Sequence, residues 1–110
     1  LNYEVKNDAE GILQDTHWSW GMFGYFPNYA LGNLYGAQIL NRLAQEIPDW
    51  KELLRQGEVL KLKEWLTKHI YQIGDLYNPL DLIKHVTGEE LNPQYFINYL
   101  TEKYSQLYGF

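Results

Sequence analysis

The sequence has no cysteine among its 110 residues. Disulfide bonds and thiolate metal sites are therefore excluded, and a reducing compartment is mildly favoured, so we expect a cytoplasmic location. A chain of this length forms at most one domain and can bury only a modest core.

Basic residues and long apolar runs are also scarce. Nine Lys and Arg residues are scattered along the chain against 14 Asp and Glu, which gives a net charge of −5. Nucleic acids are bound through clustered basic residues, so we expect no nucleic-acid partner. No apolar run approaches the roughly 20 residues that span a bilayer, and no charged-then-apolar leader opens the sequence, so we expect no membrane association.

The spacing of apolar residues after position 29 predicts helices and no strand. Roughly five helices are expected, over residues 28–47, 48–57, 57–74, 79–86 and 93–108. Asn78-Pro79 and Asn92-Pro93 each place a good capping residue before a proline at the first helical position. The sequence therefore predicts an all-α chain, irregular over residues 1–29 and helical over residues 30–110.

The irregular segment reads "GILQDTHWSWGMFGYFPNY" over residues 11–29 and gathers most of the candidate chemistry. Its aromatic residues have two interpretations, a core cluster or part of a site, and these are about equally probable for Trp18, Trp20, Phe23 and Phe26. Polar groups in aromatic surroundings must find partners or cost about 1–3 kcal/mol each. Asp15 could accept from an imidazole N–H, that of His17 included. A tyrosine hydroxyl, Tyr25 or Tyr29, could donate to an oxygen that becomes negative in a reaction.

Other kinds of site are weakly indicated. His69 lies in an apolar helical stripe and is more readily a core residue than a ligand, and His85 is distant in sequence. Asp15 and His17 could supply two metal ligands, but zinc needs three or four. We therefore expect no self-contained metal site. Ser19 near His17 does not by itself indicate a catalytic triad.

These residues, read in order, resemble the carboxypeptidase Taq family of metallocarboxypeptidases. The family pattern Gly-x-x-Gln-Asp-x-His-Trp appears here as Gly11, Gln14, Asp15, His17 and Trp18. It continues with "FGYFPNY", "LGN" and Gln38, and the C-terminal "NPLDLIKHVTGEELNP" is also similar to the family's closing pattern. The similarity covers nearly the whole chain.

The resemblance implies a function that this chain carries only in part. Family members are much longer and almost wholly helical, and they bind zinc or cobalt through a His-Glu-x-x-His helix. That motif does not occur in this sequence, which begins at Leu1. The chain therefore resembles a single C-terminal fragment of such an enzyme, expected to bind no metal and to be inactive alone.

The family's reaction is hydrolysis of the last peptide bond, which releases a C-terminal amino acid. By this resemblance Tyr29 is the transition-state donor, His17 contacts the substrate backbone and Tyr25 assists binding. The supporting residues of the segment are Gly11, Gln14, Asp15 and Trp18. The expected partners are the C-terminus of a peptide substrate, the rest of the parent chain, and a second copy in a parent homodimer.

An alternative function is a non-enzymatic helical module that binds another protein. In that hypothesis the tyrosine-rich face of residues 93–108, which includes Phe96 and Tyr99, is the partner surface.

Overall fold

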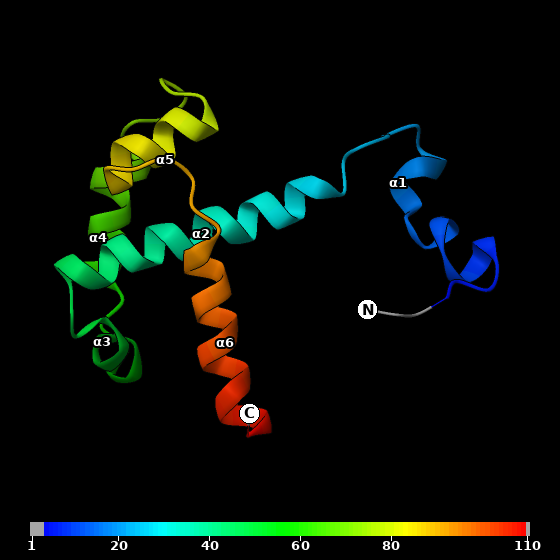
Figure 1. Ribbon diagram of the computed structural model, residues 1–110. Coiled ribbons are helices and arrows are strands. Elements are labelled where there is room, and N and C mark those ends of the chain that lie inside the picture. The colour runs from blue at the N-terminus through cyan, green and yellow to red at the C-terminus, as the bar shows by residue number, and fades with distance from the viewer. Residues whose placement is uncertain (1–3, 110) are drawn as a thin grey trace. The chain divides into compact units, whose positions relative to one another are not determined.

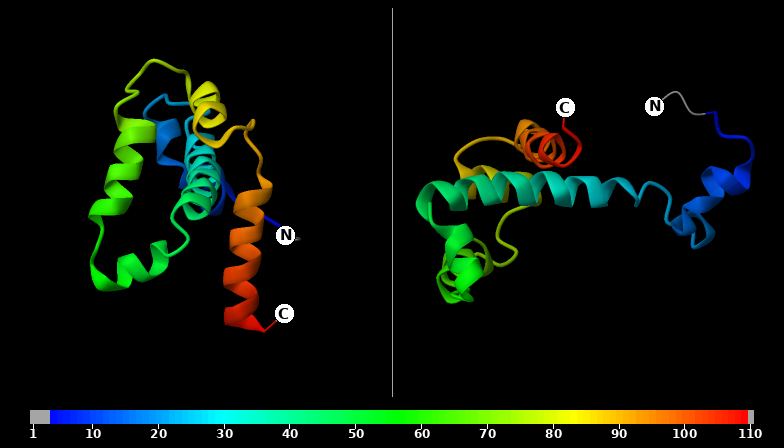
Figure 2. Two further views of the ribbon diagram at one scale, coloured as in Figure 1. Left: turned by 90° about the vertical axis from the view of Figure 1, so that its left-hand side faces the viewer. Right: turned by 90° about the horizontal axis from the view of Figure 1, so that it is seen from below.

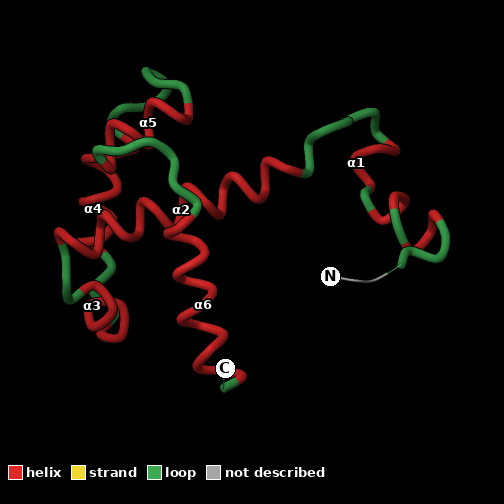
Figure 3. Tube along the Cα trace, viewed as in Figure 1, coloured by secondary structure: helices red, strands yellow, loops and turns green. Residues whose placement is uncertain are grey.

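The computed structural model describes residues 4–109 and contains six α-helices and no strand among them. Figure 3 shows helices joined by loops over this range. None of the described helices is long and apolar enough to cross a membrane. The all-α prediction is confirmed. Five described α-helices lie from Pro27 onward, and the segment expected to be irregular also holds one short α-helix and two 3-10 helices.

The chain divides into two compact units, residues 1–32 and 33–110. In the first unit two short 3-10 helices, Asp8–Glu10 and Ile12–Gln14, precede α1 (Thr16–Ser19), and α2 (Pro27–Glu46) begins. The second unit holds the rest of α2, then α3 (Trp50–Gln56), α4 (Leu60–Leu66), α5 (Pro79–Thr87) and α6 (Gln94–Tyr108).

The core of the second unit lies where α2, α4 and α5 meet. Leu43, Trp65 and Val86 contribute one buried side chain from each of these helices. Figures 1 and 2 show α4 and α5 beside the C-terminal half of α2. Partly buried apolar residues surround this centre: Ile39, Ile47, Trp50, Leu62, Leu66, Ile70 and Leu82. Burial of this cluster supplies the main hydrophobic stabilisation of the unit.

The predicted helix over residues 57–74 changes its hydrogen-bonding pattern part-way. The α-helix ends at Leu66 and continues as a π-helical stretch, Thr67–Tyr71. His69 lies in this stretch, with its ring stacked on Trp65 at 4.5 Å between centroids. Its Nε2 atom is 3.7 Å from a carboxylate oxygen of Glu46. His69 therefore lies against the core, as the spacing indicated.

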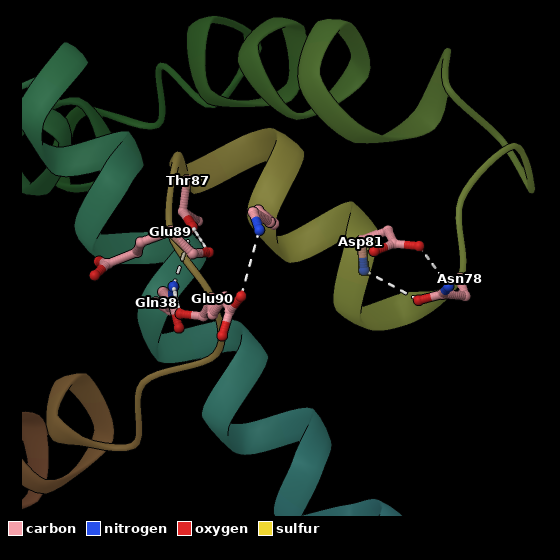
Figure 4. A network of polar contacts seen from close by, with 7 residues as sticks. Gln38, Asn78, Asp81, Thr87, Glu89 and Glu90 are labelled. Carbon is pink, nitrogen blue, oxygen red and sulfur yellow. Dashed lines mark hydrogen bonds and ion pairs between the residues drawn. The ribbon is translucent and has the colours of Figure 1, made fainter.

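The helix starts differ from one another. Asn78 caps α5 as predicted, since its side-chain oxygen accepts from the Asp81 backbone N–H at 3.0 Å (Figure 4). Asn92 accepts from the Gln94 N–H at 3.0 Å, so α6 begins one residue later than its proline suggested. Asp49 makes no side-chain cap for α3.

A buried amide fixes the connection between α5 and α6. Gln38 is only 1% exposed. Its Nε2 donates to the hydroxyl oxygen of Thr87 and to the carbonyl of Glu90, both at 3.0 Å (Figure 4). Its Oε1 accepts from the backbone N–H of Asn92 at 2.9 Å. One side chain on α2 therefore holds the whole link from Thr87 to Asn92.

We expect Gln38→Ala to lower the free energy of unfolding by about 1–3 kcal/mol, because it leaves buried donors and acceptors without partners. Urea unfolding followed by circular dichroism measures this change. Gln45→Ala is the matched control, since Gln45 is exposed on the same helix and bonds only Asn41 among the contacts of its side chain. Equal stability of the two variants would contradict the role of Gln38.

A second polar contact joins α2 to α4 and creates a dependence on pH. The indole N–H of Trp65 donates to Glu46 at 2.7 Å, and this bond holds the pKa of Glu46 below its usual value. Partial burial opposes the shift, while the nearby charge of Arg42, 2.8 Å away, adds to it. A carboxylate with a lowered pKa stabilises the fold above its unfolded pKa and loses that contribution as pH falls through the folded one.

The stability of the chain should therefore fall on acidification below about pH 4.3, the ordinary value for a glutamate. Glu46→Gln keeps an oxygen for the indole but removes the charge. We expect the difference in unfolding free energy between this variant and the parent to shrink as pH falls through that range. A constant difference between pH 7 and pH 3 would rule out Glu46 as a source of acid sensitivity.

Candidate functional site

The candidate site lies in the first unit, on the segment that the sequence singled out. Asp15 has an extended backbone and caps α1, because its Oδ1 accepts from the His17 backbone N–H at 3.1 Å. Two glycines with positive φ, Gly21 at 73° and Gly24 at 76°, then turn the chain toward α2. Glycine adopts this backbone region without steric cost, which explains why it suits both positions. The two turns bring Tyr25 and Tyr29 back to the side of His17.

His17 is held at both ring nitrogens. Nδ1 lies 2.6 Å from Oδ1 of Asp15, and Nε2 lies 3.1 Å from the hydroxyl oxygen of Tyr29. The side chain of His17 is 16% exposed, and that of Asp15 is 22% exposed. The structure therefore brings together an acid, an imidazole and a phenol in one line.

Aromatic rings enclose the imidazole. Tyr25 stacks on it at 5.0 Å between centroids, with an interplanar angle of 28°. Tyr29, Phe26 and Trp20 meet it at 5.7, 6.3 and 6.5 Å, in tilted or edge-on orientations. The contact of His17 with Asp15 is partly buried, whereas its contact with Tyr29 is exposed. Tyr25 thus stacks on the face of the same imidazole whose Nε2 atom contacts the hydroxyl of Tyr29.

The remaining predicted site residues shape the segment. The Gln14 side chain donates to the Ala9 carbonyl at 2.5 Å, across the two 3-10 helices. A Cβ atom at Gly11 would lie 2.6 Å from a methyl group of Val5, so only glycine fits there without movement. Trp18 packs edge-on against Phe23 at 5.2 Å. None of these three residues joins the line of Asp15, His17 and Tyr29.

An apolar hollow of about 380 Å³ lies on the same segment. It is lined by Gly11, Ile12, Gln14, Asp15, Trp18 and Phe26. Asp15 is common to the hollow and to the contact with His17. Phe26, which the sequence left open between core and site, lines this hollow and meets the imidazole edge-on at 6.3 Å. Its place three residues before Tyr29, on one helical turn, is the signal that links it to the site.

The aromatic cluster is exposed in the described part of the chain. Trp20, Phe23 and Phe26 are 74%, 70% and 60% exposed, and Trp18 is 44% exposed. Of these rings, Trp20 and Phe26 meet the imidazole edge-on, whereas Trp18 and Phe23 pack against each other. The segment thus combines an enclosed polar centre with exposed aromatic residues.

The donors of residues 4–109 do not fit a metal ion. No group of three or more His, Asp or Glu side chains converges anywhere in that range. His17 pairs with Asp15, His69 with Glu46, and His85 stacks on Tyr77 at 4.9 Å. Each histidine therefore has at most one acidic neighbour among the described contacts.

The sequence and the fold place the chain in one class of protein, the metallopeptidases. The chain belongs to the carboxypeptidase Taq (M32) metallopeptidase family, whose model matches residues 1–104. The resemblance stated from the motif residues is confirmed.

Individual relatives give the extent of the match. Carboxypeptidase 1 of Bacillus subtilis (strain 168) is 52% identical over 108 residues, which are 98% of this chain and 22% of that protein. Thermostable carboxypeptidase 1 of Pyrococcus furiosus is 41% identical over 104 residues, which are 94% of this chain and 21% of that protein. The crystal structure of the M32 carboxypeptidase from Deinococcus radiodurans R1 matches with a TM-score of 0.89 at 32% identity and covers 100% of this chain and 22% of its own. The chain thus spans about a fifth of the length of these relatives.

Proposed function

We propose that this chain is the C-terminal portion of a metal-dependent carboxypeptidase that hydrolyses the last peptide bond of its substrate. The observation that supports this most directly is the line from Asp15 through His17 to Tyr29, at 2.6 and 3.1 Å, in a member of a carboxypeptidase family. The segment supplies contacts to the substrate and to the transition state. The rest of the reaction belongs to the part of the relatives that this chain does not span.

Tyr29 is proposed as the transition-state donor. A phenol is protonated at neutral pH and can donate to the oxyanion that forms when water adds to a peptide carbonyl. Its hydroxyl is placed by His17, and the imidazole is kept from moving by Asp15 and by the stacked ring of Tyr25. His17 and Tyr25 are proposed as contacts to the substrate backbone beside the reacting carbonyl.

The metal ligands are proposed to lie outside this chain. The family consists of metallopeptidases. Within residues 4–109, however, no three His, Asp or Glu side chains lie close enough together to hold a metal ion. Zinc or cobalt as the metal, a homodimeric parent and a cytoplasmic location stay predictions from the resemblance. The partner of this chain is then the remainder of the parent protein, and the ligand is a peptide C-terminus.

The division of labour can be tested by comparing two proteins. The 110-residue chain alone should release no amino acid from a peptide and should retain no stoichiometric zinc or cobalt after dialysis. A full-length family member that contains the same residues should release amino acids and should retain a bound metal. Release of amino acids by the chain alone, measured by ninhydrin or mass spectrometry, would contradict the proposal.

Replacement of the phenol tests the proposed donor. In the full-length enzyme we expect Tyr29→Phe to lower kcat/KM by about 10²-fold, or roughly 3 kcal/mol, the usual cost of a lost oxyanion donor. The loss should fall mainly on kcat, since the contact strengthens in the transition state. Tyr25→Phe keeps the ring that stacks on His17 and should cost less.

Tyr71→Phe is the matched control, because Tyr71 is exposed in the second unit and is 62% accessible. It should leave both kinetic constants unchanged. Unaltered kinetics in Tyr29→Phe would remove Tyr29 from the mechanism.

A further inference from the structure

A single oxygen atom of Asp15 contacts His17 twice. Oδ1 lies 3.1 Å from the backbone nitrogen of His17 and 2.6 Å from its ring Nδ1. The first contact caps α1, which any good capping side chain could do. The second is shorter and has no role in the helix, so capping alone does not explain why this position carries a carboxylate.

The contact at Nδ1 determines where the proton of the imidazole lies. An ionised carboxylate can only accept a hydrogen bond, so Nδ1 must carry a proton to bond with Asp15. A neutral imidazole has one N–H, and Nε2 is then an acceptor. The hydroxyl of Tyr29, 3.1 Å away, is the group that donates to Nε2 in this state.

We infer that Asp15 is a positioning residue that holds neutral His17 as the Nδ1–H tautomer, so that Nε2 presents a hydrogen-bond acceptor beside Tyr29. This inference rests on the proposed function for its consequences in catalysis. Its structural content, the tautomer, depends only on contacts within the first unit.

The tautomer limits what His17 can recognise in a substrate. When Tyr29 turns its proton toward a carbonyl oxygen, Nε2 loses its donor and must find another. A peptide backbone N–H is such a donor, whereas a carbonyl oxygen is not. His17 therefore recognises a substrate amide N–H. As the oxyanion forms, the Tyr29 hydroxyl turns from Nε2 to the oxyanion, and Nε2 accepts from the substrate N–H in its place.

The first test measures the tautomer directly. Two-dimensional ¹⁵N–¹H spectra of the ¹⁵N-histidine-labelled chain distinguish a protonated Nδ1 from a protonated Nε2, and a His17→Gln variant identifies the signals of His17. We expect Nδ1–H in the parent chain and mainly Nε2–H, the form favoured by a free side chain in water, in Asp15→Ser. Serine is a good capping residue, so this variant keeps the start of α1 and removes the contact with the ring.

Asp15→Asn is the conservative variant. Its amide can turn either its oxygen or its NH2 group toward Nδ1, so it should hold the Nδ1–H form less firmly than Asp15 does and give a mixture of the two tautomers. An Nε2–H signal for His17 in the parent chain, or the same tautomer in the parent and in Asp15→Ser, would overturn the inference.

The second test asks whether Asp15 acts through Tyr29. In the full-length enzyme Asp15→Ser should lower kcat/KM by about 10- to 100-fold, the order of magnitude seen at metal sites when the hydrogen-bond partner that orients a histidine is removed. In a Tyr29→Phe background the same substitution should cost less than in the parent, because the part of its effect that acts through the phenol is already lost. Asp8→Ser is the control, an acidic residue in the first turn of a neighbouring 3-10 helix.

The two tests separate the inference from the proposed function. Full additivity of Asp15→Ser and Tyr29→Phe would show that Asp15 does not act through the phenol and would overturn the catalytic part of the inference. A full-length enzyme insensitive to Tyr29→Phe would instead contradict the proposed role of Tyr29, while the tautomer would still be decided by the spectra.

Discussion

The scarcity of fully buried apolar side chains is the constraint on which this structure depends. Among the described residues only Leu43, Leu53, Trp65, Ile83 and Val86 are buried hydrophobic residues. Five such side chains stabilise the junction of a few helices but leave the connecting segments without an apolar interior to hold them. These segments are instead fixed by hydrogen bonds from single polar side chains, and such bonds specify geometry more narrowly than apolar contacts do.

Gln38 and Asp15 perform this task in the two units. Gln38 bonds the Thr87 hydroxyl at the end of α5, the Glu90 carbonyl and the backbone N–H of Asn92, at 2.9 to 3.0 Å. Asp15 uses one oxygen to hold both the backbone and the ring of His17. In each case a side chain of the family pattern forms its hydrogen bonds with a connecting segment and not with groups inside a helix. This accounts in physical terms for why an amide and a carboxylate suit these two positions.

The sequence predicted the helices better than it predicted the contacts between them. Helical spacing and the Asn78-Pro79 start depend on residues near in sequence, and both agree with the structure. The π-helical stretch at Thr67–Tyr71 and the later start of α6 were not foreseen, because apolar periodicity does not distinguish them. For the site, the pairing of Asp15 with His17 was within reach of sequence because two residues separate them. The stacking of Tyr25 on His17 was not, since it requires the turns at Gly21 and Gly24.

The exposed aromatic residues acquire a meaning once the imidazole is seen among them. In this chain, which spans about a fifth of the length of its relatives, Phe26 is 60% exposed while it lies against His17. A ring placed this way excludes water from one side of a polar group and leaves its other side to whatever the segment faces. Such an arrangement shields the contact of Asp15 with His17 in part and leaves the contact of His17 with Tyr29 exposed. The proposed role in a substrate groove needs this combination, because the polar line must be preorganised before a peptide arrives and must still be reachable by it.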